Sequence, residues 1–165
     1  MNYGMLETQN GRCGMIEGLG FYVLRKISDG RGSVMHLMKK SDPIFRDFDI
    51  KEVYFSMIYP GVIKAWHRHT DKTLNFAVVS GNIKSVIYDE SENDFLEFYL
   101  GDNCQHGILR IPPMTWNGFT SVDGKPAILV NVTDFEYSPE GIERKNIYEE
   151  FESGACYDWT KSKYG

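Results

Sequence analysis

The strongest constraint on the fold is a hydrophobic period of two that recurs along most of the chain. In the segment KEVYFSMIY (51–59), Val53, Phe55 and Met57 fall on one face, and Tyr54 and Ser56 fall on the other. The same alternation occurs in residues 21–27, 32–38, 74–81, 82–89, 95–100, 107–111 and 127–132. Successive side chains of a β-strand point to opposite faces, so this pattern predicts eight or so short strands. Short strands at close spacing are typical of a β-sandwich or barrel.

Turn-forming residues separate these segments. Ser80-Gly81-Asn82 lies between two apolar stretches and predicts a tight hairpin, and the compositions of DESEND (89–94) and VDGKP (122–126) predict turns. Residues 139–152 are the only stretch with a weak helical pattern. We therefore expect one all-β domain over residues 1–165, with its core at about 20–135 and a short, partly helical C-terminal tail.

Composition excludes several classes of protein. The chain has 165 residues, 42% of them hydrophobic, and no apolar run approaches the ~20 residues of a membrane helix. Its first residues show no signal-peptide pattern, and three widely spaced cysteines do not form a disulfide framework, so we expect a cytoplasmic protein with reduced thiols. The net charge is −5, with the acidic excess in residues 134–158 and no basic stripe elsewhere. Neither a membrane nor a nucleic acid is therefore an expected partner.

The feature most suggestive of chemistry is the pair His67 and His69 in the segment WHRH (66–69). On a strand, residues i and i+2 share a face, so both imidazoles point the same way. Three interpretations are open: two exposed polar side chains, an acid–base pair, or a metal site completed by a remote donor such as His106. Open metal sites usually keep at least three protein ligands. We therefore expect acid–base work, with no metal and no cofactor.

The spacing around these histidines resembles the first cupin motif, in which a glycine precedes His-x-His by five residues. Gly61 occupies the glycine position, and Leu74 stands where metal-binding cupins have a glutamate. Residues 111–119 resemble the second cupin motif, with Asn117 in place of its histidine ligand. The resemblance implies a double-stranded β-helix (jelly-roll) barrel, and the two replacements favour a metal-free cupin.

Within the cupins, the chain resembles the dTDP-4-dehydrorhamnose 3,5-epimerase family, the RmlC-like cupins. Four segments carry this resemblance in the family's order: Asp29-Gly30-Arg31-Gly32, GVIKAWH (61–67), RIPP with Gly118-Phe119 (110–119), and Thr133-Asp134-Phe135 followed by YSPE (137–140). The resemblance implies an isomerase of a nucleotide-diphosphate sugar, acting on a 4-keto-6-deoxyhexose in deoxysugar and polysaccharide biosynthesis. It also implies a homodimer that exchanges N-terminal strands.

The resemblance also suggests roles for individual residues. His67 matches the family's base, with His69 as a second candidate for proton transfer, and Lys64 and Asn117 are candidates to stabilise the enolate. Candidate substrate-binding residues are the cations suited to a diphosphate (Arg31, Arg68 and Lys72), the aromatic residues (Trp66, Trp116, Phe119 and Tyr59) and Asp134. Burial in the barrel core is the competing interpretation for each aromatic residue.

Two departures leave the reaction open. The family's acid is a tyrosine on the strand that corresponds to residues 129–134, and that stretch contains no tyrosine here. The His67-Arg68-His69 segment resembles the 3,4-ketoisomerases of the same fold. We favour an epimerase, with dTDP-4-keto-6-deoxyhexose 3,4-ketoisomerase as the alternative and a non-catalytic sugar-binding cupin as a second alternative.

Overall fold

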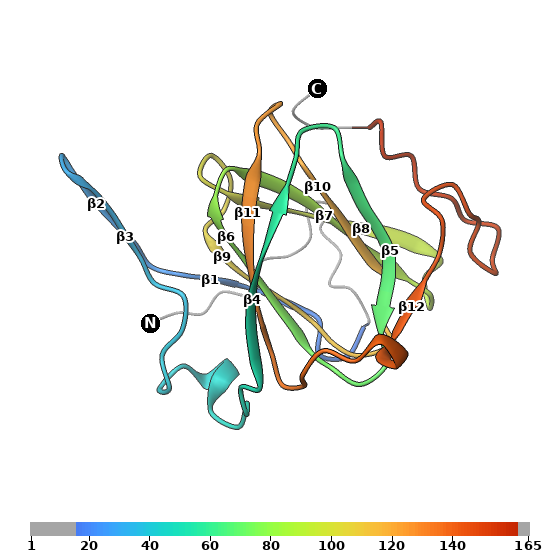
Figure 1. The fold of residues 1–165 in the computed structure, drawn as a ribbon, viewed down its shortest axis with the longest axis horizontal. Coiled ribbons are helices and arrows are strands. Elements are labelled where there is room, and N and C mark those ends of the chain that lie inside the picture. Colours follow the sequence, from blue (N-terminus) through green and yellow to red (C-terminus); the bar gives the residue numbers. More distant parts are fainter. Residues whose placement is uncertain (1–15, 162–165) are drawn as a thin grey trace.

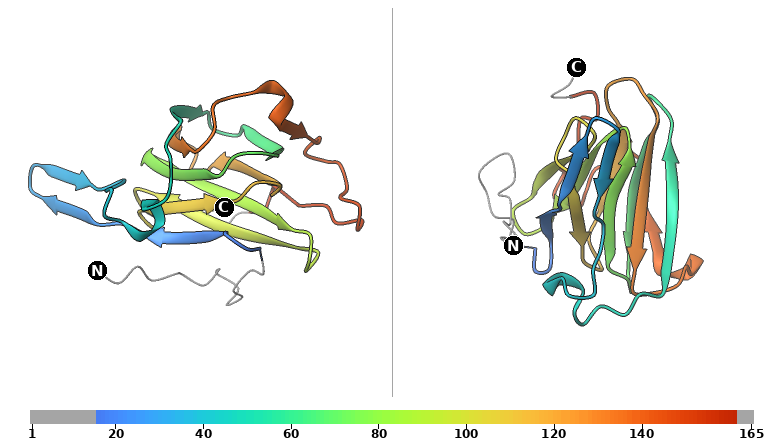
Figure 2. Two further views of the ribbon diagram at one scale, coloured as in Figure 1. Left: turned by 90° about the horizontal axis from the view of Figure 1, so that it is seen from below. Right: turned by 90° about the vertical axis from the view of Figure 1, so that its left-hand side faces the viewer.

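Two five-stranded antiparallel sheets face each other in the structure, a computed structural model that describes residues 16–161 (Figures 1 and 2). The first sheet contains, in spatial order, β1 (Gly20–Val23), β9 (Gly107–Ile111), β6 (Leu74–Ser80), β11 (Ala127–Thr133) and β4 (Glu52–Ile58). The second contains β12 (Ile142–Arg144), β5 (Ile63–His69), β10 (Asn117–Ser121), β7 (Asn82–Asp89) and β8 (Asp94–Gly101). The all-β prediction is confirmed.

The N-terminal part departs from the predicted strand over residues 21–27. The chain leaves the first sheet after β1 and forms a separate two-stranded hairpin of β2 (Lys26–Asp29) and β3 (Gly32–Met35), which projects from the barrel (Figure 1). A 3₁₀ turn, Pro43–Phe45, follows and returns the chain to the first sheet. Most of the hairpin is exposed, so its pairing rests on local hydrogen bonds rather than on the core.

The turn at Gly81 joins the two sheets and is not the predicted hairpin. β6 belongs to the first sheet and β7 to the second, and the partner of β7 across the following turn is β8. Gly81 has a φ of 77°, and a Cβ there would lie 2.5 Å from the Pro126 carbonyl oxygen. Only glycine combines this conformation with so close a backbone approach, so the residue makes a corner between the layers.

The C-terminal tail differs from the weak helical prediction for residues 139–152. It is helical only over the 3₁₀ turn Pro139–Gly141, and Ile142–Arg144 then pairs antiparallel with β5 as strand β12. The unpaired edge of β5 offers backbone hydrogen-bonding groups to an extended segment, which compete with a helix. Among the described residues, no helix is long and apolar enough to cross a membrane.

The core lies between the two sheets, and each sheet is also covered on part of its outer face. Fifteen buried residues fill the space between the sheets, among them Phe76, Phe119 and Leu129. The tail covers the outer face of the second sheet, where Trp66 and Phe151 pack with centroids 5.3 Å apart. All eight residues of β7 are consequently buried. The interior is not filled throughout, and its open part forms the candidate site.

Candidate active site

A cavity of about 610 Å³ opens between the sheets, in the size range of small-molecule sites. The first sheet contributes its polar wall through the inward side of β4, and β5 of the second sheet forms the facing wall. Leu74, Phe76, Leu129 and Phe119 supply its apolar side chains. Residues of the tail complete the lining. The arrangement suits a ligand with an apolar face and several polar substituents.

β5 brings both predicted histidines into this cavity. Their ring centroids are 6.0 Å apart, and the His67 ring packs edge-on against Phe119, also at 6.0 Å. His69 is 7% exposed, and its Nδ1 has no hydrogen-bond partner. A buried polar atom without a partner costs free energy in the folded protein, so a polar group of a ligand would be stabilised here.

Both imidazoles are kept uncharged at neutral pH. Burial lowers the pKa of His67 from 6.5 to about 4, and the positive charges of Arg144 and Lys64 act in the same direction, as does His69. Burial also lowers the pKa of His69 to about 4, with Lys72 and Arg144 adding to the effect and Asp71 opposing it. A neutral imidazole has a free lone pair, as a general base requires.

An irregularity in the pairing of β5 with β10 places Lys64 on the same side as His67. Asn117 pairs with His67, whereas Phe119 pairs with Lys64, so the register shifts by one residue between them. Strict alternation would put residues 64 and 67 on opposite faces. The shift restores a common face, and Lys64 lines the cavity with its Nζ 6.0 Å from the Phe119 ring centroid.

Tyr54 is a candidate acid on the opposite wall that the sequence analysis did not identify. It lies on the inward face of β4, and its hydroxyl oxygen accepts a hydrogen bond of 2.8 Å from Asn131 Nδ2. Burial raises the pKa of the Tyr54 phenol, so the phenol keeps its proton at neutral pH. The sequence feature that could have identified Tyr54 is that it shares a polar face with Ser56 on an otherwise apolar strand.

The tail supplies two further cavity residues that were not predicted, Arg144 and Lys145. Arg144 is exposed and pairs in register with His67, at the edge of the second sheet. Lys145 borders the cavity, but its Nζ lies over the Trp116 and Phe151 rings on the outer face and forms an ion pair of 3.1 Å with Glu149. The sequence signal for Arg144 was weak, because an acidic segment that was expected to be partly helical gave no reason to place a cation in the barrel.

Three predicted site residues have buried structural contacts outside the cavity. Asn117 is fully buried, and its Nδ2 donates to the carbonyl oxygens of His67 and Thr115. Lys72 is 1% exposed, with its Nζ 3.7 Å from Glu52. Asp134 accepts a hydrogen bond from the backbone N–H of Thr73. These contacts fasten strands and loops around the site.

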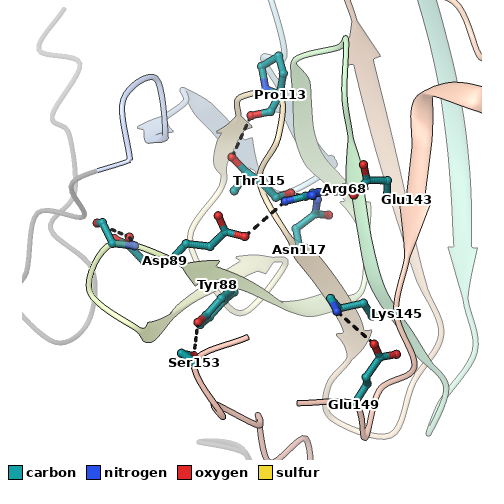
Figure 3. A network of polar contacts seen from close by, with 12 residues as sticks. Arg68, Tyr88, Asp89, Pro113, Thr115, Asn117, Glu143, Lys145, Glu149 and Ser153 are labelled. Atoms are coloured by element: carbon teal, nitrogen blue, oxygen red, sulfur yellow. Dashed lines mark hydrogen bonds and ion pairs between the residues drawn. The ribbon is translucent and has the colours of Figure 1, made fainter. Parts of the chain in front are cut away.

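Arg68 and Trp116 lie on the outer face of the second sheet. Alternation turns Arg68 away from the cavity, towards Glu143 (Figure 3), and its guanidinium stacks over Trp116 at 4.8 Å. Trp66 contributes to the cavity lining, but its ring packs in the outer aromatic cluster. Both tryptophans are buried in this outer cluster under the tail, not in the core between the sheets.

Arg31 and Tyr59 also lie outside the cavity. Arg31 is at the tip of the projecting β2–β3 hairpin, and its side chain pairs with Asp29 at 2.6 Å. Tyr59 follows the end of β4 and is 64% exposed. Neither residue contacts the cavity of its own chain. Of the predicted residues, the cavity is lined by His67, His69, Lys64, Phe119 and Trp66.

The metal-site hypothesis lacks its third ligand. His106 lies before β9, and its Nε2 is 2.8 Å from the carbonyl oxygen of His36. Within residues 16–161, no group of three or more His, Cys, Asp or Glu side chains is arranged to hold a metal ion. The polar side chains that line the cavity include the two imidazoles, the Tyr54 phenol, the Glu52 carboxylate and the cations Lys64 and Arg144.

A jelly-roll barrel with paired imidazoles in its cavity is the arrangement of a cupin. The model of the family described as "FdtA: WxcM-like, C-terminal" matches residues 17–153. The chain belongs to this family.

Named relatives act on sugars. The chain is 32% identical over 126 residues to a probable low-salt glycan biosynthesis epimerase, Agl13, of Haloferax volcanii, covering 73% of this chain and 80% of the relative. It is 30% identical to the crystal structure of a dTDP sugar isomerase from Desulfovibrio desulfuricans, with a TM-score of 0.77 and coverage of 90% and 94%. The dTDP-4-dehydrorhamnose 3,5-epimerase of Bacillus anthracis shares the fold at 18% identity, with a TM-score of 0.69 and coverage of 86% and 82%. The predicted RmlC-like cupin fold is confirmed.

Proposed function

We propose that the protein is an isomerase of a nucleotide-linked 4-keto-6-deoxyhexose that works as an epimerase in deoxysugar and polysaccharide biosynthesis. One observation carries this proposal: a neutral imidazole, His67, and a protonated phenol, Tyr54, line facing walls of one cavity. The family of the chain and the sugar epimerase and isomerase named among its relatives support the substrate class.

The proposed step is proton transfer next to the 4-keto group. His67 takes the proton from the sugar carbon, the C–H electron pair forms a C=C bond, and the carbonyl becomes an enolate with its charge on oxygen. Lys64 stabilises that charge. Tyr54 then gives its proton to the same carbon from the opposite face, which inverts the centre and restores the ketone. The phenolate, which accepts a hydrogen bond from Asn131, regains a proton from solvent, and the His67 imidazolium releases its proton to solvent, so both groups return to their starting states.

The second candidate, 3,4-ketoisomerisation, is favoured by the placement of His67 and His69 on one wall. Two neutral bases with ring centroids 6.0 Å apart can move a proton between neighbouring carbons on a single face of the sugar. Reprotonation then occurs at C4 of the enediol instead of C3, and the carbonyl ends at C3. Tyr54 has no necessary part in that reaction, which makes the two candidates separable.

The test is proton NMR of dTDP-4-keto-6-deoxyglucose in D₂O with the purified protein. We expect loss of the H3 or H5 signal above the enzyme-free rate, followed by signals of an epimer. His67→Gln should abolish both, by about 10³-fold or more, because the base is removed. Tyr54→Phe should keep the exchange and lose the epimer, since His67 still removes the proton but nothing returns one to the other face.

Each contrary result has a meaning. A 3-keto product that survives Tyr54→Phe would establish the ketoisomerase. Binding without exchange would establish a non-catalytic sugar-binding cupin. Near-normal activity in His67→Gln, with the fold unchanged by circular dichroism, would refute the role of His67.

We also propose a homodimer located in the cytoplasm. Three apolar side chains on the outward face of β4, Val53, Phe55 and Met57, are each at least half exposed, and a second copy of the chain would cover them. The free, exposed thiol of Cys156 suits a reducing compartment.

A further inference from the structure

The three-residue strand β12 connects two sets of charged residues on opposite faces of the second sheet. It pairs with β5 so that Ile142 lies opposite His69, Glu143 opposite Arg68, and Arg144 opposite His67. Because side chains alternate along a strand, Ile142 and Arg144 line the cavity, whereas Glu143 points to the outer face. Arg144 lies at the sheet edge and also borders the outer pocket that Arg68 and Glu143 line.

On the outer face, Glu143 is held by Arg68. The Arg68 Nε lies 2.6 Å from the Glu143 carboxylate, and its Nη1 lies 3.4 Å from Glu90 (Figure 3 shows Arg68 beside Glu143). Arg68 is only 20% exposed, because its guanidinium stacks on Trp116. A guanidinium already fixed by stacking loses little conformational entropy on binding, so this ion pair restrains Glu143 more than an ordinary surface pair would.

The restraint matters because β12 is short and lies at the edge of its sheet. Backbone hydrogen bonds of 3.0 and 3.1 Å between Trp66 and Lys145 extend the pairing by one position. Three paired residues form a small set of contacts for a segment that is otherwise exposed to solvent. Side-chain anchoring on the outer face therefore contributes a large share of the order of Arg144 on the inner face.

Arg144 is placed to bind an anion. It is exposed where it lines the cavity, and no carboxylate lies within ion-pair distance of it among the described residues. His69, by contrast, is deeply buried. Arg144 at the solvent side and the histidines inside orient a nucleotide sugar with its hexose inward and its diphosphate at the mouth.

We propose that Arg144 binds the diphosphate of the substrate, and that Arg68 is a positioning residue that holds Arg144 in place through Glu143 and β12. This inference rests on the proposed function for its ligand class. It gives Arg68 a role other than the direct substrate contact expected from the sequence.

The test compares the wild type with Arg144→Ala, Arg68→Met and the double variant. Binding of dTDP and of inorganic pyrophosphate is measured by calorimetry, and kcat and KM are measured with dTDP-4-keto-6-deoxyglucose. We expect Arg144→Ala to weaken dTDP binding by about tenfold and Arg68→Met by about three- to fivefold. Both should raise KM and leave kcat within about twofold, because His67 and Tyr54 are unchanged.

Two further variants separate positioning from general stability. Glu143→Gln breaks the same ion pair from the β12 side and should reproduce the effect of Arg68→Met. It also tests the link if Arg68→Met fails to fold. Glu90→Gln removes the other ion pair of Arg68 without touching β12, and should leave dTDP binding unchanged. Adding Arg68→Met to Arg144→Ala should cause no further loss, since the positioned group is already gone.

Unchanged dTDP binding in Arg144→Ala would overturn the proposal, as would additive losses in the double variant. An equal loss in Glu90→Gln and Glu143→Gln would overturn the positioning role. These failures differ from failure of the proposed function. If the proposed function fails, the wild-type protein binds dTDP but exchanges no sugar proton. The comparison of dTDP binding between the wild type and the Arg144 and Arg68 variants still tests the inference in that case.

Discussion

At the residue scale, the two cavity histidines should determine the acid limit of activity. Because burial and neighbouring cations lower the pKa of His67 to about 4, the base stays neutral well below pH 6. We expect kcat/KM to be constant from pH 8 to about pH 5 and to fall with a midpoint near pH 4, not near the ordinary value of 6.5. The measurement is kcat/KM for the nucleotide sugar across that range.

The same shift affects stability, so the profile needs a folding control. In the unfolded chain His67 and His69 regain ordinary pKa values and bind protons below about pH 6.5, whereas in the folded protein they do not until about pH 4. Above pH 6.5 neither state binds these protons, so the two histidines cost no stability. As the pH falls from 6.5 towards 4, the unfolded chain binds more protons than the folded protein, and the free energy of unfolding decreases. Near-UV circular dichroism at each pH separates loss of the base from unfolding. A midpoint near 6.5 in fully folded protein would contradict the prediction.

At the element scale, the corner between β6 and β7 depends on Gly81. Gly81→Ala should reduce the free energy of unfolding by about 2–4 kcal/mol, from an unfavourable positive φ and a clash with Pro126. Gly124→Ala is the matched control, because Gly124 also has a positive φ, 67°, but nothing lies within 4 Å of an added Cβ. It should lose only about 1–2 kcal/mol. Urea denaturation measures both, and equal losses would show that the close approach has no energetic weight.

At the scale of the whole molecule, the exposed apolar face of β4 predicts self-association. Phe55, in the middle of this face, is 67% exposed. We expect the wild type to sediment as a dimer, at twice the 19.0 kDa mass of one chain. Phe55→Asp should shift it to the monomer, because a buried carboxylate without a partner is costly. Tyr148→Asp, at a residue 80% exposed on the tail, should leave the mass unchanged. A monomeric wild type at micromolar concentration would refute the dimer.

Much of this architecture follows from local pattern. The period of two identifies β4, β6, β7, β8, β9 and β11 within a residue or two, because alternation is a property of the extended backbone itself. It does not identify β10 or β12. The glycine at position 81 marks a sharp turn, because its conformation excludes other residues. His67 and His69 share a face because residues i and i+2 of a strand point the same way, so the sequence spacing alone predicted that their side chains lie together.

The rest depended on contacts between distant segments. Alternation defines two faces of β4 but not which one is inside. Position in the barrel placed Tyr54 in the cavity and the apolar face outside. The register shift opposite β10 brought in Lys64, and the open edge of β5 turned an expected helical segment into the strand that carries Arg144. The sequence alone therefore determined about half of the strands and the pair of histidines on one face. Tertiary structure decided which phenol and which cations lie around them, because those side chains come from strands that meet only when the barrel closes.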